Sequence, residues 1–196
     1  MNCIGEKGTV LTWSPHENTI LKDIGAQMKK YGYGNDELQN WFSQLVKIKG
    51  GSEGRILDMH DLAKHFYYHP YMKGSTSIKV TLPAVLKSTR SEAISALLKN
   101  FESELNLFAQ NEDGEIENPY KLLPHLKFSE GEIKVSDGTG AMRAYQEMLY
   151  GMSKNNLALK NEWSQALLRY CKLDTLAMII IWEHWQDVLQ RELVID

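Results

Sequence analysis

A phenol and a carboxylate near the C-terminal end of the sequence have the spacing of a small catalytic pair. Tyr170 and Asp174 are four residues apart within a segment whose apolar residues recur at helical spacing, so both side chains should lie on one face of a helix. Such a pair suits hydrolysis in which a carboxylate holds a divalent ion and a hydroxyl orients the attacking water. A tyrosine packed between helices beside a surface aspartate also explains the spacing.

A second carboxylate, Glu17, is expected at the point where a strand gives way to a helix. Residues 8–14 form a β-branched and apolar run that predicts a buried strand. In open α/β sheets, functional side chains often project from the carboxyl ends of strands. Glu17 is therefore either a metal ligand or a first-turn carboxylate that only favours the helix dipole.

A turn at residues 73–79 contains groups that suit phosphate binding. Ser75, Ser77 and Lys79 would offer hydroxyls, exposed amides and a cation within one short segment. The turn also serves simply to redirect the chain.

Three histidines invite a zinc interpretation. His65 and His69 are four residues apart and His60 is close in sequence, although neither a cysteine nor a fourth ligand stands at the usual spacing. The zinc hypothesis stays open beside that of ordinary surface histidines.

Apolar periodicity predicts the elements that must position these residues. Their order at the start of the chain (strand, helix, helix, strand, helix) is that of an α/β domain, and no linker divides the sequence, so one domain over residues 1–196 is expected. The predicted elements are a strand over 8–14, a helix to about residue 31, a helix with its apolar face over 38–46 and capping residues within Asn35-Asp36-Glu37, a strand over 55–59, helices over 62–66, near 83–86, over 90–108 and 142–149, and a helical C-terminal stretch that bends near Tyr170.

Composition excludes several classes of function. A hydrophobic share of 43% and a charged share of 24% fit an ordinary globular chain. The net charge of -3 provides no global basic field, so any contact with nucleic acid must be local or metal-mediated. Cys3 and Cys171 have no partner at metal-ligand or redox spacing. With no long apolar run, these features predict a cytoplasmic protein without a membrane partner.

Four segments together resemble a bacterial domain family of unknown function that looks like a branch of the DEDD (DEDDy-type) 3′-to-5′ exonucleases. The resemblance covers nearly the whole chain. It implies an α/β fold: a partial, helix-rich ribonuclease H-like exonuclease fold with a small residual sheet and a helical insertion at about 88–130. The segments that carry it are Gly74–Lys79 with Leu82-Pro83, Asn118–Pro124, Asp137-Gly138 ahead of Ala141-Met142, and Leu167–Met178.

The same resemblance assigns roles to the candidate residues. Asp174 would correspond to the last metal-binding carboxylate, Tyr170 to the water-orienting phenol, and Glu17 to the acidic residue after the fourth strand. The implied cofactors are Mg²⁺ or Mn²⁺ ions, and the implied substrate is the 3′ end of a nucleic acid.

The family's first motif, an Asp-x-Glu on the first strand, has no counterpart in this sequence. Asp113-Gly114-Glu115 matches the residue types of this motif but lies in a polar loop with no strand pattern before it. The strand over 8–14 should then show an unpaired edge unless a loop, a helix or another chain covers it. A missing N-terminal segment or a partner chain is therefore a possible partner. We therefore expect an incomplete or inactive exonuclease-like domain. The alternative is a catalytically dead remnant that binds protein or nucleic acid.

Overall fold

The chain divides into two units, residues 1–68 (unit 1) and residues 69–196 (unit 2). The prediction of one domain over the whole chain is not tested by this division and stays a prediction. None of the helices in the described part of the chain combines the length and apolar character needed to cross a bilayer. The computed structural model describes residues 4–49, 53–105, 108, 112, 116–123, 125–128, 131–135, 138–151 and 155–193.

Unit 1 contains a two-stranded parallel sheet and three helices. Strand β1 (Val10–Thr12) pairs with β2 (Ile56–Asp58), so that Val10 stands opposite Ile56. Helices α1 (His16–Tyr31) and α2 (Asp36–Leu45) connect the strands, and α3 (Met59–Phe66) follows β2. The predicted strand, helix, helix, strand, helix order is confirmed, and the general α/β class with it. The ribonuclease H-like fold stays a prediction.

Local chemistry explains where the helices of unit 1 begin and end. The Asn35 side chain accepts a hydrogen bond from the backbone N–H of Leu38 at 2.9 Å, which confirms the predicted cap of α2. Gly32 ends α1 in the left-handed conformation, with φ of 68°, as expected of a C-terminal glycine. The apolar faces of these elements meet around a buried cluster of Trp41, Leu45 and Ile56.

Gly54 fixes the return of the chain from α2 into β2. Its φ is +65°, and a Cβ atom there would lie 2.5 Å from the backbone carbonyl carbon of Val46. Both the dihedral and the close backbone approach require glycine, so the register of β2 depends on this residue.

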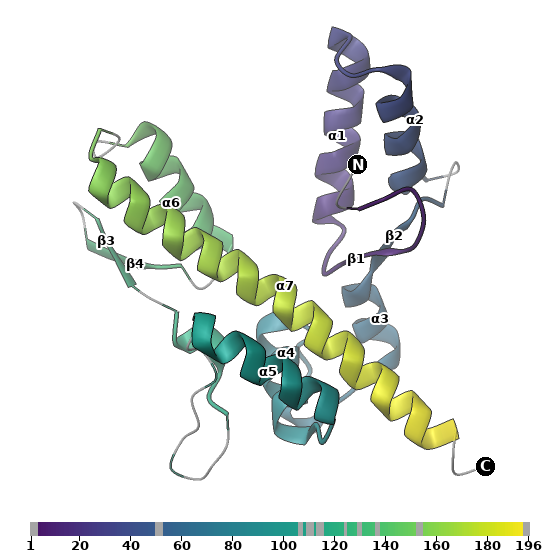
Figure 1. Cartoon of the computed structure of the whole chain (residues 1–196), viewed down its shortest axis with the longest axis vertical. Coiled ribbons are helices and arrows are strands. Elements are labelled where there is room, and N and C mark those ends of the chain that lie inside the picture. The colour runs from purple at the N-terminus through teal and green to yellow at the C-terminus, as the bar shows by residue number, and fades with distance from the viewer. Residues whose placement is uncertain are drawn as a thin grey trace. The chain divides into compact units, whose positions relative to one another are not determined.

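Unit 2 is organised around one long helix, α7 (Leu157–Leu193), of 37 residues. Helices α4 (Ile78–Ser88), α5 (Glu92–Leu105) and α6 (Gly138–Tyr150) pack against it (Figure 1). The shorter elements are η1 (Pro70–Met72), η2 (Pro119–Lys121), and the antiparallel strands β3 (His125–Phe128) and β4 (Gly131–Lys134). The largest α7 side chains that are fully buried are Trp163, Leu173, Leu176, Ile180 and Ile181.

Two sequence predictions for unit 2 are corrected, and one element of the structure was not predicted. The predicted turn over 73–79 ends earlier, because α4 already begins at Ile78 and includes Lys79 in its first turn. The β3–β4 hairpin has no predicted counterpart. The predicted bend near Tyr170 is wrong, since α7 runs through that residue without a break.

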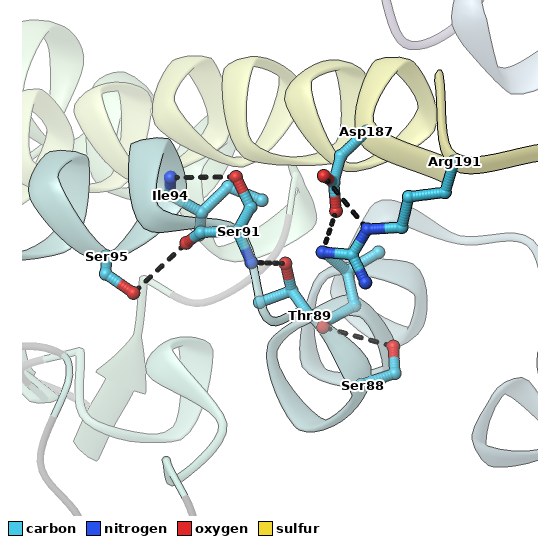
Figure 2. A network of polar contacts seen from close by, with 8 residues as sticks. Ser88, Thr89, Ser91, Ile94, Ser95, Asp187 and Arg191 are labelled. Carbon is cyan, nitrogen blue, oxygen red and sulfur yellow. Dashed lines mark hydrogen bonds and ion pairs between the residues drawn. The ribbon is translucent and has the colours of Figure 1, made fainter. Parts of the chain in front are cut away.

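The junction between α4 and α5 is held by short side-chain caps (Figure 2). The hydroxyl of Thr89 accepts a hydrogen bond from the Ser91 N–H at 3.3 Å, and the Ser91 hydroxyl accepts one from the Ile94 N–H at 3.4 Å. Ser91 thereby starts α5 in the manner of an N-cap. Figure 2 also shows the ion pair between Arg191 and Asp187, 2.9 Å apart on α7.

Candidate functional site

Three segments of unit 2 that are distant in sequence meet at Asp174. The hydroxyl of Tyr120, in η2, donates a hydrogen bond to Asp174 Oδ1 at 2.7 Å. The Lys79 ammonium, on α4, lies 5.9 Å from the ring centroids of both Tyr120 and Tyr170. We refer to Lys79, Tyr120, Tyr170 and Asp174 as the Asp174 cluster. It combines a carboxylate, a cation and two phenols.

A proline inside α4 explains how η2 comes to lie beside it. Pro83 has no N–H to donate to the carbonyl of Lys79, its normal i-4 partner, and the ring would crowd that carbonyl. The side-chain amide of Asn118 donates to this carbonyl instead, in a long hydrogen bond of 3.5 Å. The Asn118 oxygen also accepts from the Tyr120 N–H at 3.1 Å. Asn118 therefore attaches the first turn of η2 to α4 and positions Tyr120.

The Tyr120 phenol is held in its neutral form. Its side chain is only 4% exposed, and this burial raises the pKa of Tyr120 above its ordinary value. The negative charge of Asp174 and the hydrogen bond to it raise the pKa further, and Tyr170 adds to the same effect. Tyr120 is thus a permanent hydrogen-bond donor to the carboxylate across the physiological pH range.

The thiol next to the cluster is not activated. Burial raises the pKa of Cys171, and the Asp174 carboxylate raises it further. Because the thiolate is the nucleophilic form, nucleophilic catalysis by Cys171 is disfavoured.

Lys79 is the cationic member of the cluster and is only partly buried. Its position near two aromatic faces is favourable by about 0.5–1 kcal/mol per contact at such a partly exposed site. An ammonium on a partly exposed residue, held near two aromatic rings, suits an incoming anion such as a phosphate oxygen.

The carboxylates of the described residues do not by themselves make a site for two divalent ions. No group of three or more His, Cys, Asp and Glu side chains that could hold a metal ion occurs among them. The Asp174 cluster offers one carboxylate, and one of its oxygens already accepts from Tyr120. A two-ion site uses several carboxylates, so the residues present do not fit that cofactor unaided.

Glu17 lies in unit 1, whereas Tyr170 and Asp174 lie in unit 2. The Glu17 carboxylate is exposed and accepts a hydrogen bond from the Ser14 hydroxyl at 3.1 Å. The same hydroxyl accepts from the His16 N–H. This local network fits a carboxylate that helps to start α1, and the metal-ligand role of Glu17 stays a hypothesis.

The two serines proposed for phosphate binding precede α4. Ser75 and Ser77 are exposed, and the Ser75 hydroxyl accepts from the Ser77 N–H at 3.4 Å. Ser77 is the residue just before the helix.

Asp113-Gly114-Glu115 and Asp137 lie outside the described residues.

The three histidines have separate surroundings. His60 stacks on Trp13 with ring centroids 6.0 Å apart, and His65 Nδ1 lies 2.8 Å from the Asp61 carbonyl oxygen. His69 belongs to unit 2 and accepts from the Tyr71 N–H through its own Nδ1. These contacts are those of ordinary surface histidines.

Sequence reasoning missed the residue that contacts Asp174. The Asn118–Pro124 segment was part of the resemblance, yet no residue in it received a role. The sequence did contain a signal for this contact. Asn118-Pro119-Tyr120 is a short capping motif. Pro83, four residues after Lys79, leaves the Lys79 carbonyl without its normal helical N–H donor, so another donor is expected there.

Comparison with known families gives a match for the N-terminal part of the chain. Residues 1–77 match the model of a family described as "Domain of unknown function (DUF2779)". The matched residues cover unit 1 and extend to the residue before α4. No curated protein and no solved structure matches the chain. The domain of unknown function is thereby supported, while the exonuclease relationship stays a hypothesis.

Proposed function

We propose that this chain carries an incomplete DEDD-type 3′-to-5′ exonuclease-like domain, in which the Asp174 cluster is the retained part of a phosphodiester site. The observation that carries the proposal is the hydrogen bond from Tyr120 to Asp174 together with the position of the Lys79 ammonium near the rings of Tyr120 and Tyr170. These residues come from three of the segments that carry the resemblance to that family.

In this proposal the residues have distinct tasks. Lys79, with the hydroxyls of Ser75 and Ser77, holds phosphate oxygens near a 3′ end, as a cation and short polar side chains do elsewhere. Tyr120 keeps the Asp174 carboxylate oriented, and the Tyr170 ring lies beside Lys79 in the same cluster. In the complete form of such a domain, Mg²⁺ or Mn²⁺ bound by Asp174 and further carboxylates would supply the Lewis acid. This chain contributes binding of the 3′ end, and its described residues contribute too few carboxylates for hydrolysis.

Nuclease and binding assays test this function together. Purified protein is incubated with 3′-labelled single-stranded DNA or RNA in Mg²⁺ or Mn²⁺, and we expect little or no release of mononucleotides. We also expect oligonucleotide binding that Lys79→Ala weakens several-fold, because one phosphate contact is lost. Lys99→Ala, at an exposed lysine of α5, is the matched control and should leave binding unchanged.

Two results would contradict the proposal in different ways. Efficient metal-dependent release of mononucleotides, abolished by Asp174→Ala, would show that the site is complete. Binding that is equally strong in Lys79→Ala and Lys99→Ala would show that the Asp174 cluster does not hold phosphate.

A non-catalytic binding module is the second candidate. It is favoured by the hydrogen bond from buried Tyr120 to Asp174 Oδ1, since this bond gives the carboxylate a structural role. The two candidates differ in their response to Mg²⁺. Oligonucleotide binding that Mg²⁺ strengthens and Asp174→Asn weakens supports the exonuclease-like site. Oligonucleotide binding that changes neither with Mg²⁺ nor in Asp174→Asn supports the non-catalytic binding module.

A further inference from the structure

The two long helices of unit 1 enclose an apolar groove. Helices α1 and α2 contact each other and run in opposite directions (Figure 1). A hollow with a cavity volume of about 210 Å³ lies along their shared face. Four of the five lining residues of α1 recur at i, i+3, i+4 and i+7, and those of α2 recur at i, i+3 and i+4; two more follow the end of α2. The groove therefore follows the helix axes rather than forming a round pocket.

Small residues give the groove its depth. Gly25 allows α1 to approach α2 closely, because a Cβ there would lie 3.2 Å from Cδ1 of Phe42. Ala26 and Ser43 line the hollow with short side chains, while Phe42 and Val46 supply apolar walls. Ala26 is exposed although it is apolar, which leaves the floor of the groove open to a partner.

The rim of the groove carries positive charge. Lys22 and Lys29 line it and are both exposed. They are seven residues apart on α1, so about 10 Å separates their attachment points along the helix axis. Neither Asp nor Glu occurs among the described residues that line the groove. The rim is therefore suited to two negative charges spaced two helical turns apart.

We infer that this groove binds an acidic amphipathic helix of a partner protein. Two apolar side chains of that helix, three or four residues apart, enter the hollow, and carboxylates two turns apart pair with Lys22 and Lys29. Helix-in-groove recognition uses this spacing of apolar anchors. The volume favours side-chain anchors over an enclosed small molecule, because small-molecule sites usually measure about 300–1,000 Å³.

A peptide selection tests the inference without assuming a sequence. Random displayed peptides of about 16 residues, just beyond the length at which isolated helices are marginal, are selected on the full-length chain. We expect the enriched peptides to combine apolar residues at i and i+3 or i+4 with carboxylates two turns apart. A synthetic copy of the most enriched peptide, labelled with fluorescein, is then titrated by fluorescence anisotropy.

Variants of the chain locate the binding site. The double variant Lys22→Glu and Lys29→Glu should weaken binding roughly tenfold or more, because two ion pairs become like-charge contacts. Ala26→Trp should weaken it similarly by filling the groove. The matched controls are Lys7→Glu with Lys64→Glu and Gln27→Trp, which change exposed residues outside the lining. These controls should bind as the unchanged chain does.

Several outcomes would overturn the inference. One is enrichment of peptides without carboxylates, and another is equal binding to the groove variants and their controls. In parallel titrations with decanoate and with a single-stranded oligonucleotide, binding that Ala26→Trp abolishes, with no peptide enriched, would assign the groove to a different ligand. Self-association of the unchanged chain that Ala26→Trp abolishes would identify a second copy as the occupant.

Discussion

Removing the hydroxyl of Tyr120 should lower the free energy of unfolding of unit 2 by a predictable amount. In Tyr120→Phe the 2.7 Å hydrogen bond to Asp174 is lost, while the ring that fills the site remains. Hydrogen bonds to charged groups contribute about 1.5–3 kcal/mol to the free energy of unfolding. Because Asp174 is only partly buried, water can solvate its carboxylate after the change, and we expect a cost at the low end, about 1.5 kcal/mol.

The reverse deletion should cost more. Asp174→Ala leaves the Tyr120 hydroxyl without the carboxylate that accepts its hydrogen bond, at a site only 4% exposed. Loss of a buried partner carries a desolvation penalty of about 1–3 kcal/mol. The double variant removes both polar groups, so its cost should be smaller than the sum of the single costs by about 1.5 kcal/mol.

Chemical denaturation of the four chains, followed by circular dichroism and tryptophan fluorescence, measures this double-mutant cycle. Tyr145→Phe removes the hydroxyl of a tyrosine on α6 that is 53% exposed. This control should change the free energy of unfolding by no more than about 0.5 kcal/mol. Single costs that add to within about 0.5 kcal/mol would refute the proposed coupling between Tyr120 and Asp174.

Three further measurements test the local arguments. Because the folded-state pKa of Tyr120 lies above its unfolded value of 10.0, its contribution to stability is fully present below about pH 10 and is lost as pH rises above it. The free energy of unfolding should therefore fall more steeply between about pH 9 and about pH 11 in the unchanged chain than in Tyr120→Phe. Gly54→Ala should lower the free energy of unfolding by more than the ~1–2 kcal/mol that a left-handed residue costs, because the new Cβ also clashes with backbone. Gly32→Ala has open space around its Cβ and should cost only the left-handed conformation. Equal losses of unfolding free energy for the two variants in chemical denaturation would contradict this reasoning. Asn118→Ala should lower the free energy of unfolding by about 1 kcal/mol or more in the unchanged chain. The loss should be smaller in the Pro83→Ala background, because residue 83 then has an N–H that can donate to the Lys79 carbonyl. An equal loss in both backgrounds, measured in the same denaturation assay, would argue against the hydrogen bond from Asn118 to that carbonyl.

Local signals were sufficient for most of unit 1. The apolar periodicity of α1 and α2, the cap at Asn35 and the strand-like composition of β1 and β2 depend on neighbours a few residues away, and the structure agrees with them. Signals were weaker in unit 2. Strands β3 and β4 mix apolar with charged residues, so they lack the apolar and β-branched run that predicted β1.

Spacing along one helix also predicted how two residues of the Asp174 cluster lie relative to each other. Tyr170 and Asp174 lie one turn apart on α7, as four-residue spacing requires. The start of α4 was misjudged because Gly74 and the serines after it resemble a turn, whereas packing of α4 against α7 extends the helix back to Ile78.

The sequence by itself determined the order of strands and helices in unit 1, the capping segment before α2, and that Tyr170 and Asp174 share a face. Only the tertiary structure decided that the partner of Asp174 is Tyr120, 54 residues earlier in the chain. It also decided that small residues of α1 and α2 border a groove. The physical reason is range: caps and periodicity are set by bonds within one or two turns, whereas a hydrogen bond across 54 residues depends on how whole helices pack.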